Sequence, residues 1–189
     1  IINDIFNNNN FVEKKFDAIF RAKFNTNSSI ACENIAKYIN FVMKQCNKDN
    51  IEIDEHDEFD KIISLLKYVK DKDYLEAFLM KCLSGRLLNK TNLDFEHILI
   101  NKLKLLFGGE FINKMNSMMS DIHISKGLSD EYKTHESFDK GLEVSVITNF
   151  IWNMSKYKQV DYPDSLQTKI NSFTNFYNRK FKGRKLEWN

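Results

Sequence analysis

The chain has 189 residues, enough for one large domain or for one domain and part of a second. Hydrophobic residues make up 42% and charged residues 29%, as in folded globular proteins, which excludes an intrinsically disordered chain. The formal net charge of +2 is too small to drive binding to nucleic acid or to an anionic membrane. No apolar run approaches the ~20 residues that a membrane-spanning helix needs.

Residues that break helices are scarce, with one proline and six glycines, and this favours long helices. The chain opens with an asparagine-rich stretch that we interpret as a loop. Apolar residues then recur at three- and four-residue steps from Phe11 to Phe20, which predicts an amphipathic helix. A second helix is expected to begin after Ser28 or Ser29. The apolar residues expected near one face of it are Ile30, Ile35, Ile39, Val42 and Met43.

Four carboxylates, Asp54, Glu55, Asp57 and Glu58, precede the next apolar stripe. A cluster of acids could form a metal site or an acid/base pair. Carboxylates in the first turn of a helix also pair with its free backbone N–H groups and complement the positive end of the helix dipole. No ligand spacing accompanies the cluster, so we interpret it as a helix start with a solvated face.

The stretch Asp71–Leu88, DKDYLEAFLMKCLSGRLL, predicts a further helix. Its apolar stripe contains Leu75, Phe78, Leu79, Cys82, Leu83 and Leu87. Thr91 or Asn92 can cap the helix that follows, and Gly108-Gly109 is a typical helix stop.

Another helix is expected from about Glu110 to Asp121, with Ser125 as the cap of a separate one. We expect the helical bundle to reach about Glu136. The following LEVSVITNFIW is β-branched and partly alternating, which predicts one strand or an extended segment. Asp161 and Pro163 then mark the entry to a last helix.

No pattern indicates a catalytic, cofactor-binding or metal site. The four histidines include no pair at i, i+4 on one predicted helix, and phosphate-binding and nucleophile motifs are absent. Cys32, Cys46 and Cys82 are odd in number and form no CxxC pair, so we interpret them as reduced and partly buried thiols. A cysteine–histidine nucleophile pair is not ruled out by spacing, but nothing selects one.

The chain closes with a basic cluster, Arg179–Lys185, interleaved with aromatic residues. One interpretation is a single-strand nucleic-acid surface, in which bases stack on the aromatic rings. The other is that the aromatic residues are core residues and the cluster leads into a strand, because Leu186 and Trp188 follow at strand-like alternation. The small net charge favours the second interpretation.

The stretch Asp71–Leu88 resembles the cullin signature, an Asp-Lys-Asp start followed by Phe and then by Lys-x-Leu-x-x-Arg-Leu-Leu. The residues that carry this resemblance are Asp71, Lys72, Asp73, Phe78, Lys81, Leu83, Arg86, Leu87 and Leu88. It continues without a gap to Lys126, resumes at Trp152 and ends with Gly183-Arg184-Lys185-Leu186-x-Trp188.

The resemblance implies a mainly α fold: a cullin-type four-helix bundle with preceding connecting helices, plus a small, incomplete α/β portion at the C-terminal end. It implies three parts. Residues 1–50 would be the end of the N-terminal stalk and connecting helices, and residues 51–138 the four-helix bundle. Residues 139–189 would be the extended segment, helix and first strand of a truncated α/β domain. Since the chain begins with Ile1, we expect a segment of a longer protein.

Cullins are scaffolds of ubiquitin ligases, so the resemblance implies a non-catalytic, rigid segment between an adaptor-binding stalk and a RING-binding end, without cofactor. A RING-box subunit would bind the domain that continues past Asn189, and Arg184, Lys185, Leu186 and Trp188 would begin the sheet that receives it. Substrate adaptors would bind the missing stalk, and a ubiquitin-conjugating enzyme would act indirectly. No nucleic acid or membrane partner is implied, and the expected location is cytoplasmic, nuclear or both. The alternatives are the cullin-like subunit of the anaphase-promoting complex and, less favoured, a nucleic-acid-binding helical domain.

Overall fold

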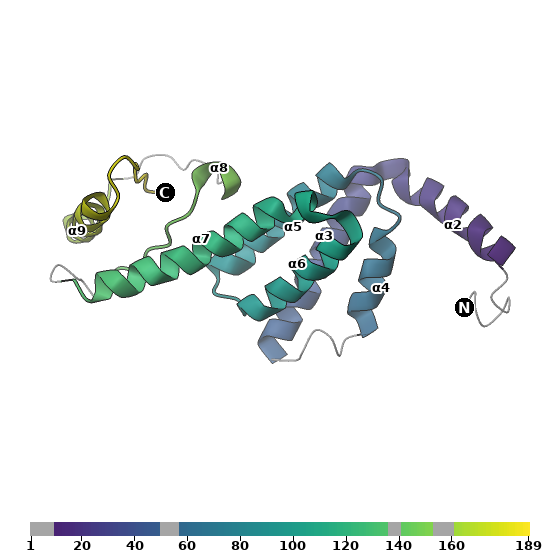
Figure 1. Ribbon diagram of the computed structural model, residues 1–189, viewed down its shortest axis with the longest axis horizontal. Helices are drawn as coiled ribbons and strands as arrows, with labels where there is room; N and C mark the ends of the chain where they lie inside the picture. The colour runs from purple at the N-terminus through teal and green to yellow at the C-terminus, as the bar shows by residue number, and fades with distance from the viewer. Residues whose placement is uncertain (1–9, 50–56, 136–140, 153–160) are drawn as a thin grey trace. The chain divides into compact units, whose positions relative to one another are not determined.

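The computed structural model describes residues 10–49, 57–135, 141–152 and 161–189, and these are mostly helical (Figure 1). The chain forms two compact units, Ile1–Asn116 and Ser117–Asn189. The helices are α2 (Asn10–Phe24), η1 (a 3-10 turn, Asn25–Asn27), α3 (Ser28–Asp49), α4 (Asp57–Leu66), α5 (Lys72–Leu88), α6 (Leu93–Phe107), α7 (Gly109–Lys133), α8 (Asn149–Trp152) and α9 (Asp164–Lys180).

The first two predicted helices are confirmed as α2 and α3, but the predicted buried face of α3 is partly wrong. Ile39, Val42 and Met43 are buried as expected, whereas Ile30 is 57% exposed. The buried face begins two residues after Ile30, at Cys32. Two residues correspond to about 200° around a helix, so Ile30 lies on the opposite side.

The sequence signals at the two ends of α6 are confirmed. The Asn92 side chain accepts a hydrogen bond from the Asp94 backbone N–H at 2.9 Å and so caps α6. Gly108 ends that helix with a φ of 92°, a conformation that favours glycine. Of the proposed capping carboxylates, Asp54 and Glu55 lie outside the described residues.

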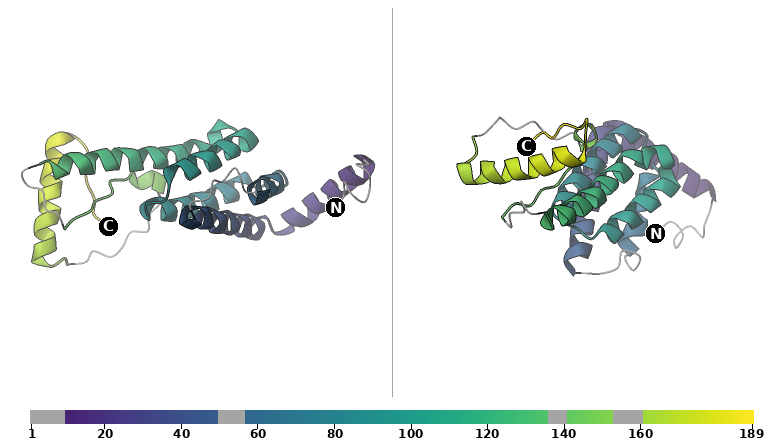
Figure 2. Two further views of the ribbon diagram at one scale, coloured as in Figure 1. Left: turned by 90° about the horizontal axis from the view of Figure 1, so that it is seen from below. Right: turned by 60° about the vertical axis from the view of Figure 1, so that its left-hand side comes forward.

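The core of the first unit is built on α3 and α5, which pack side by side (Figures 1 and 2). Each presents apolar residues at three- and four-residue steps, so one stripe faces the other helix. Further apolar side chains come from α4, α6 and the first turns of α7. The buried residues of α3 and α5 include Cys32, Ala36, Ile39, Met43, Cys46, Leu75, Leu79, Leu83 and Leu87.

The two helices predicted after Gly109 are one continuous helix, α7, so the prediction that Ser125 caps a separate helix is wrong. Ser125 is buried in the middle of α7, and its hydroxyl accepts a hydrogen bond from the Val146 backbone N–H at 2.8 Å. Serine favours helix caps because its hydroxyl pairs with backbone groups. Here the backbone group comes from a distant segment, so the helix is not interrupted.

The second unit is organised around an aromatic cluster where α9 crosses the C-terminal end of α7 (Figure 2). Tyr132 on α7 contacts Phe173 on α9 edge-on, with ring centroids 5.0 Å apart. Its hydroxyl also shares a 2.9 Å hydrogen bond with Ser172. The buried members of the cluster are Leu128, Tyr132, Phe173, Phe176 and Tyr177.

Residues 142–148 are extended, as the alternating pattern predicted, but they are not a β-strand. Their backbone pairs with polar side chains that recur once per turn of α7. Asp121 accepts from the Thr148 N–H at 2.8 Å, Ser125 accepts from the Val146 N–H, and Ser129 donates to the Val144 carbonyl oxygen at 3.1 Å. A helix face therefore takes the place of a neighbouring strand.

The predicted α/β portion is not shown, because none of the described residues is in a strand. The expected first strand, residues 184–188, lacks strand hydrogen bonds and lies against the aromatic cluster through Leu186 and Trp188. A strand exists only where a partner strand receives its backbone hydrogen bonds. The domain bounds proposed above stay a prediction, and two of them fall at or within residues outside the described ranges.

Candidate functional site

The signature residues of Asp71–Leu88 fall on two sides of α5. Leu83, Arg86 and Leu87 are buried, at 2–3% exposure. Phe78 is half-buried, and Asp71 precedes the helix with its carbonyl oxygen 3.8 Å from the Cys32 thiol sulfur. The outward-facing members are Lys72, Asp73, Lys81 and Leu88. The signature thus combines core positions with a solvent-facing surface.

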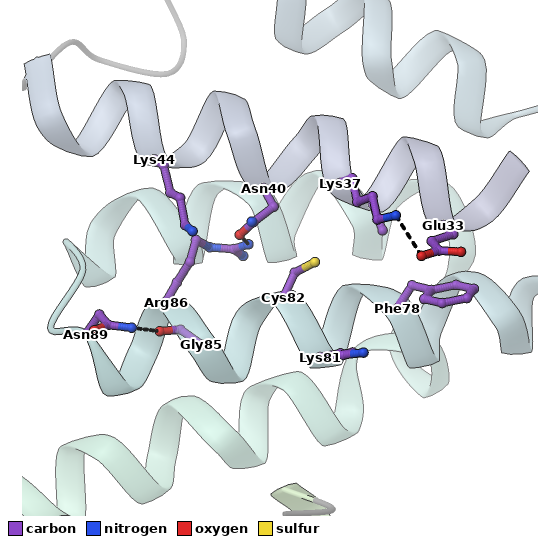
Figure 3. A pocket seen from close by; sticks show the side chains of 11 residues that line it. Glu33, Lys37, Asn40, Lys44, Phe78, Lys81, Cys82, Gly85, Arg86 and Asn89 are labelled. Carbon is purple, nitrogen blue, oxygen red and sulfur yellow. Dashed lines mark hydrogen bonds and ion pairs between the residues drawn. The ribbon is translucent and has the colours of Figure 1, made fainter. Parts of the chain in front are cut away.

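Arg86 is the buried centre of a polar network that connects three helices. Its Nε and Nη2 atoms donate to the two carboxylate oxygens of Glu96 on α6, at 2.6 and 2.8 Å. Its Nη1 atom donates to the Asn40 side-chain oxygen on α3 at 2.9 Å (Figure 3). The paired geometry matches the planar guanidinium to the carboxylate, so both charges are satisfied inside the core.

Sequence reasoning missed Glu96 and Asn40. Glu96 is 0% exposed although it is charged, and glutamate is rarely buried without a partner. A signal existed, because Glu96 lies three residues before Leu99 and seven before Leu103, on the apolar face of α6. Asn40 borders the buried face of α3 and gave no such signal.

A groove of ≈ 260 Å³ lies between α3 and α5, over this network (Figure 3). Two signature residues, Phe78 and Lys81, line it beside Arg86. Lysines from both helices surround it, and Lys37 pairs with Glu33 on the same helix at 2.8 Å. The remaining lining residues are Ala36, Asn40, Lys44, Cys82, Gly85 and Asn89.

Cys82 lies in this groove and is a free, half-buried thiol. Burial raises the pKa of Cys82 above its ordinary value, and the nearby cations Arg86, Lys44, Lys81 and Lys37 oppose that rise. The pKa of Glu33 is lowered by its hydrogen bond and charge interaction with Lys37. The positive groups outnumber the negative ones here, so the groove is suited to anionic groups.

The four C-terminal residues proposed as a sheet start lie together near the aromatic cluster of the second unit. Trp188 donates to the Thr174 hydroxyl at 3.1 Å and contacts Phe173 edge-on at 5.9 Å between centroids. Leu186 packs on the same cluster and, like Trp188, is half-buried. The guanidinium carbon of Arg184 lies 4.9 Å from the Phe181 ring centroid. The Lys185 ammonium lies 3.4 Å from the Glu187 carboxylate.

Within the described ranges, no group of three or more histidine, cysteine, aspartate or glutamate side chains could hold a metal ion. Among the helices of those same ranges, none is both long and apolar enough to cross a bilayer.

The comparisons with known proteins agree with the resemblance. Residues 1–129 match the family model of the cullin α-solenoid domain. Cullin-1 of Schizosaccharomyces pombe is 31% identical over 202 aligned positions, which cover 100% of this chain and 26% of that protein. Cullin-2 of Caenorhabditis elegans is 30% identical, covering 84% of this chain and 23% of that protein. Cullin-4A of Mus musculus is 29% identical, covering 89% and 23% respectively.

A mainly helical chain with a buried signature arginine thus matches one family from end to end. The chain belongs to the cullin family. It spans about a quarter of the length of the curated relatives, from 23% to 26% in these three.

Proposed function

We propose that this chain is a rigid, non-catalytic scaffold segment of a cullin-RING ubiquitin ligase, located between an adaptor-binding stalk and a RING-binding end. The observation that carries the proposal is the burial of the signature residue Arg86, which connects α3, α5 and α6 through Asn40 and Glu96. A side chain on one helix that bonds to two others restricts the relative movement of all three. Membership of the cullin family supports the ligase assignment.

Rigidity is the property that such a scaffold contributes to the reaction. A ligase must hold a substrate and an activated ubiquitin carrier at a suitable distance and orientation, because proximity and orientation supply much of the rate. A closely packed helical core resists bending and has low compressibility. The chain would thus act on the rate without touching the reacting atoms.

The partners belong to the same proposal. A RING-box subunit would bind the domain that continues past Asn189, and Arg184, Lys185, Leu186 and Trp188 would begin the sheet that receives it. A subunit that adds a strand to a sheet needs partner strands with exposed backbone edges. Substrate adaptors would bind the stalk that precedes this chain, and a ubiquitin-conjugating enzyme would be recruited indirectly. The expected location is the cytoplasm, the nucleus or both.

Co-purification with a RING-box subunit tests the proposal. The 189-residue chain and a longer form continued through the relatives' remaining C-terminal length would be compared. We expect capture by the longer form and weak capture by the shorter one. Capture by neither, under conditions in which a known cullin binds, would overturn the ligase assignment. Capture of the RING subunit of the anaphase-promoting complex instead would favour the cullin-like subunit of that complex.

A further inference from the structure

The junction between α2 and α3 is a 3-10 turn, η1, rather than an uninterrupted α-helix. Phe24 and Ser28, on either side of η1, both keep right-handed helical dihedral angles, so the chain changes helix type without forming a loop. A short 3-10 stretch within a helical run often marks a hinge, since its hydrogen bonds are less favourable than those of an α-helix. None of the side chains of α2 is buried, so packing alone holds that helix weakly.

Tyr68, in the turn between α4 and α5, lies against α2. It is 6% exposed, and its hydroxyl donates a hydrogen bond to the Asp17 carboxylate on α2. Its ring is 4.7 Å from the Phe20 ring, centroid to centroid, at an interplanar angle of 59°. A third residue of α2, Arg21, also contacts the ring: its guanidinium carbon lies 5.7 Å from the centroid of the Tyr68 ring.

Asn25, in η1, makes the complementary connection to the same turn. Its side-chain nitrogen donates to the Tyr68 carbonyl oxygen and to the Arg21 carbonyl oxygen, both at 2.8 Å. Its side-chain oxygen accepts from the Lys70 backbone N–H at 3.0 Å. One side-chain amide on η1 therefore bonds both to α2 and to the turn before α5.

From this geometry we infer that Tyr68 and Asn25 are positioning residues that fix the direction of α2 relative to α3 and α5. These contacts lie beside η1, the 3-10 turn between α2 and α3. A small change of backbone angle in η1 would change the direction of the whole of α2. The inference rests on the proposed function, in which an adaptor-binding stalk precedes α2. The direction of α2 would then set where the stalk holds bound substrate.

Burial and the contact with Asp17 favour the protonated form of the Tyr68 hydroxyl. Burial raises the pKa of Tyr68, and its hydrogen bond to Asp17 raises it further, whereas Lys67 opposes the rise without reversing it. The Lys67 ammonium also lies 4.8 Å from the ring centroid. The protonated phenol is the form that can donate to Asp17.

The test measures the spread of distances between two spin labels on the 189-residue chain. The labels are placed at exposed positions on α2 and α6, by Lys14→Cys and Asn101→Cys, in a Cys82→Ser background. We expect Tyr68→Ala to broaden the distance distribution roughly twofold. Tyr74→Ala, at a tyrosine that is 52% exposed on α5, is the matched control and should leave it unchanged.

Two conservative variants separate positioning from general loss of stability. Asp17→Asn keeps an oxygen that accepts from the Tyr68 hydroxyl and should retain the narrow distribution, whereas Asp17→Ala should broaden it. If Tyr68→Ala fails to fold, Asn25→Ala removes the second connection without opening a cavity in the apolar core. Its control is Asn34→Ala, at an exposed asparagine on α3.

Equal distance distributions for Tyr68→Ala and its control Tyr74→Ala would overturn the inference. If Tyr68→Ala does not fold, equal distributions for Asn25→Ala and its control Asn34→Ala would overturn it. No partner protein is present in this experiment. A failure to capture a RING-box subunit would therefore leave the label measurement unaffected, and the two proposals can fail separately.

Discussion

The Arg86 guanidinium and the Glu96 carboxylate form a two-point ion pair inside the first unit, with both side chains at 3% exposure or less. Together with Asn40 they leave no unsatisfied buried polar side-chain atom among the described residues. Desolvating two charges is costly, and good geometry with full hydrogen bonding is what offsets that cost.

Removing one partner of this ion pair should destabilise the protein strongly. Glu96→Ala leaves Arg86 as an unpaired buried charge, for which we expect a loss of about 3–5 kcal/mol in the free energy of unfolding. Urea unfolding followed by circular dichroism measures it. Glu110→Ala, at an exposed glutamate in the first turn of α7, is the control and should change little. A loss no larger than that of the control would contradict the role of the pair.

Replacing both partners by apolar residues separates the charge from the packing. Arg86→Met combined with Glu96→Leu leaves no unpaired charge, so we expect a smaller loss than for Glu96→Ala alone. Asn40 would lose one hydrogen bond in this double variant. A double variant less stable than Glu96→Ala would indicate that the pair contributes more than the satisfaction of its own charges.

Leu83→Ala should create a cavity in the core of the first unit. Leu83 is 2% exposed, and truncating a buried leucine costs about 2–5 kcal/mol. Leu88→Ala on the same helix is the matched control, since that leucine is 37% exposed. Thermal unfolding compares the two, and an unchanged midpoint for Leu83→Ala would show that the core tolerates the loss.

Ser125→Ala tests whether α7 holds the extended segment through its hydroxyl groups. The substitution leaves the Val146 N–H without its acceptor, and an unsatisfied buried group costs about 1–3 kcal/mol. Ser120→Ala lies on the same helix at an exposed position and serves as the control. Amide hydrogen exchange at Val146 should accelerate in the first variant only. Unchanged exchange would mean that the segment is held by its apolar side chains.

The reactivity of Cys82 should depend on pH in a direction set by its surroundings. Only the thiolate reacts with iodoacetamide, and burial raises the Cys82 pKa above its ordinary value, so alkylation should be slow at neutral pH and accelerate in alkaline solution. Because the folded state holds the proton more tightly than the unfolded chain, this group's contribution to stability should fall as the pH rises through the raised Cys82 pKa.

A lysine substitution sharpens this prediction. Lys81 is one of the cations that lower the Cys82 pKa, so Lys81→Gln should raise it further and slow alkylation at pH 8. Lys104→Gln, at an exposed lysine on α6, should leave the rate unchanged. Mass spectrometry of the modified peptide gives both rates. Faster alkylation of Lys81→Gln would show that access, rather than charge, controls this thiol.

Much of the helical architecture was predictable because it rests on local rules. Asn92 signals a helix start by its side-chain oxygen, and Gly108 signals a helix end because it lacks a side chain and so adopts a positive φ. The leucines of α5 mark its buried face by their spacing. Ser125 misled the prediction because a serine that caps a helix and one that holds a distant backbone N–H look alike in sequence. Which partner a hydroxyl finds depends on residues far along the chain.

The hydrogen-bond partners of the extended segment could not be predicted for a related reason. The alternation in residues 142–148 gave the extended conformation correctly, yet alternation says nothing about what pairs with the backbone. Asp121, Ser125 and Ser129 supply those bonds from a helix. The partners of Arg86 and Tyr68 were equally hidden, because Asn40 and Asp17 lie 46 and 51 residues away from them.

The spacing of the Arg86 contacts along the chain also implies an order of assembly. Arg86 and Glu96 are separated by 10 residues, whereas Asn40 and Arg86 are separated by 46. Closing the shorter loop costs less chain entropy, by about 1.4 kcal/mol if the cost grows with the logarithm of loop length. The α5–α6 hairpin can therefore nucleate first, with its ion pair still hydrated. When α3 docks, it excludes water from the Arg86–Glu96 ion pair. The free-energy cost of desolvating the two charges would therefore fall on a late folding step.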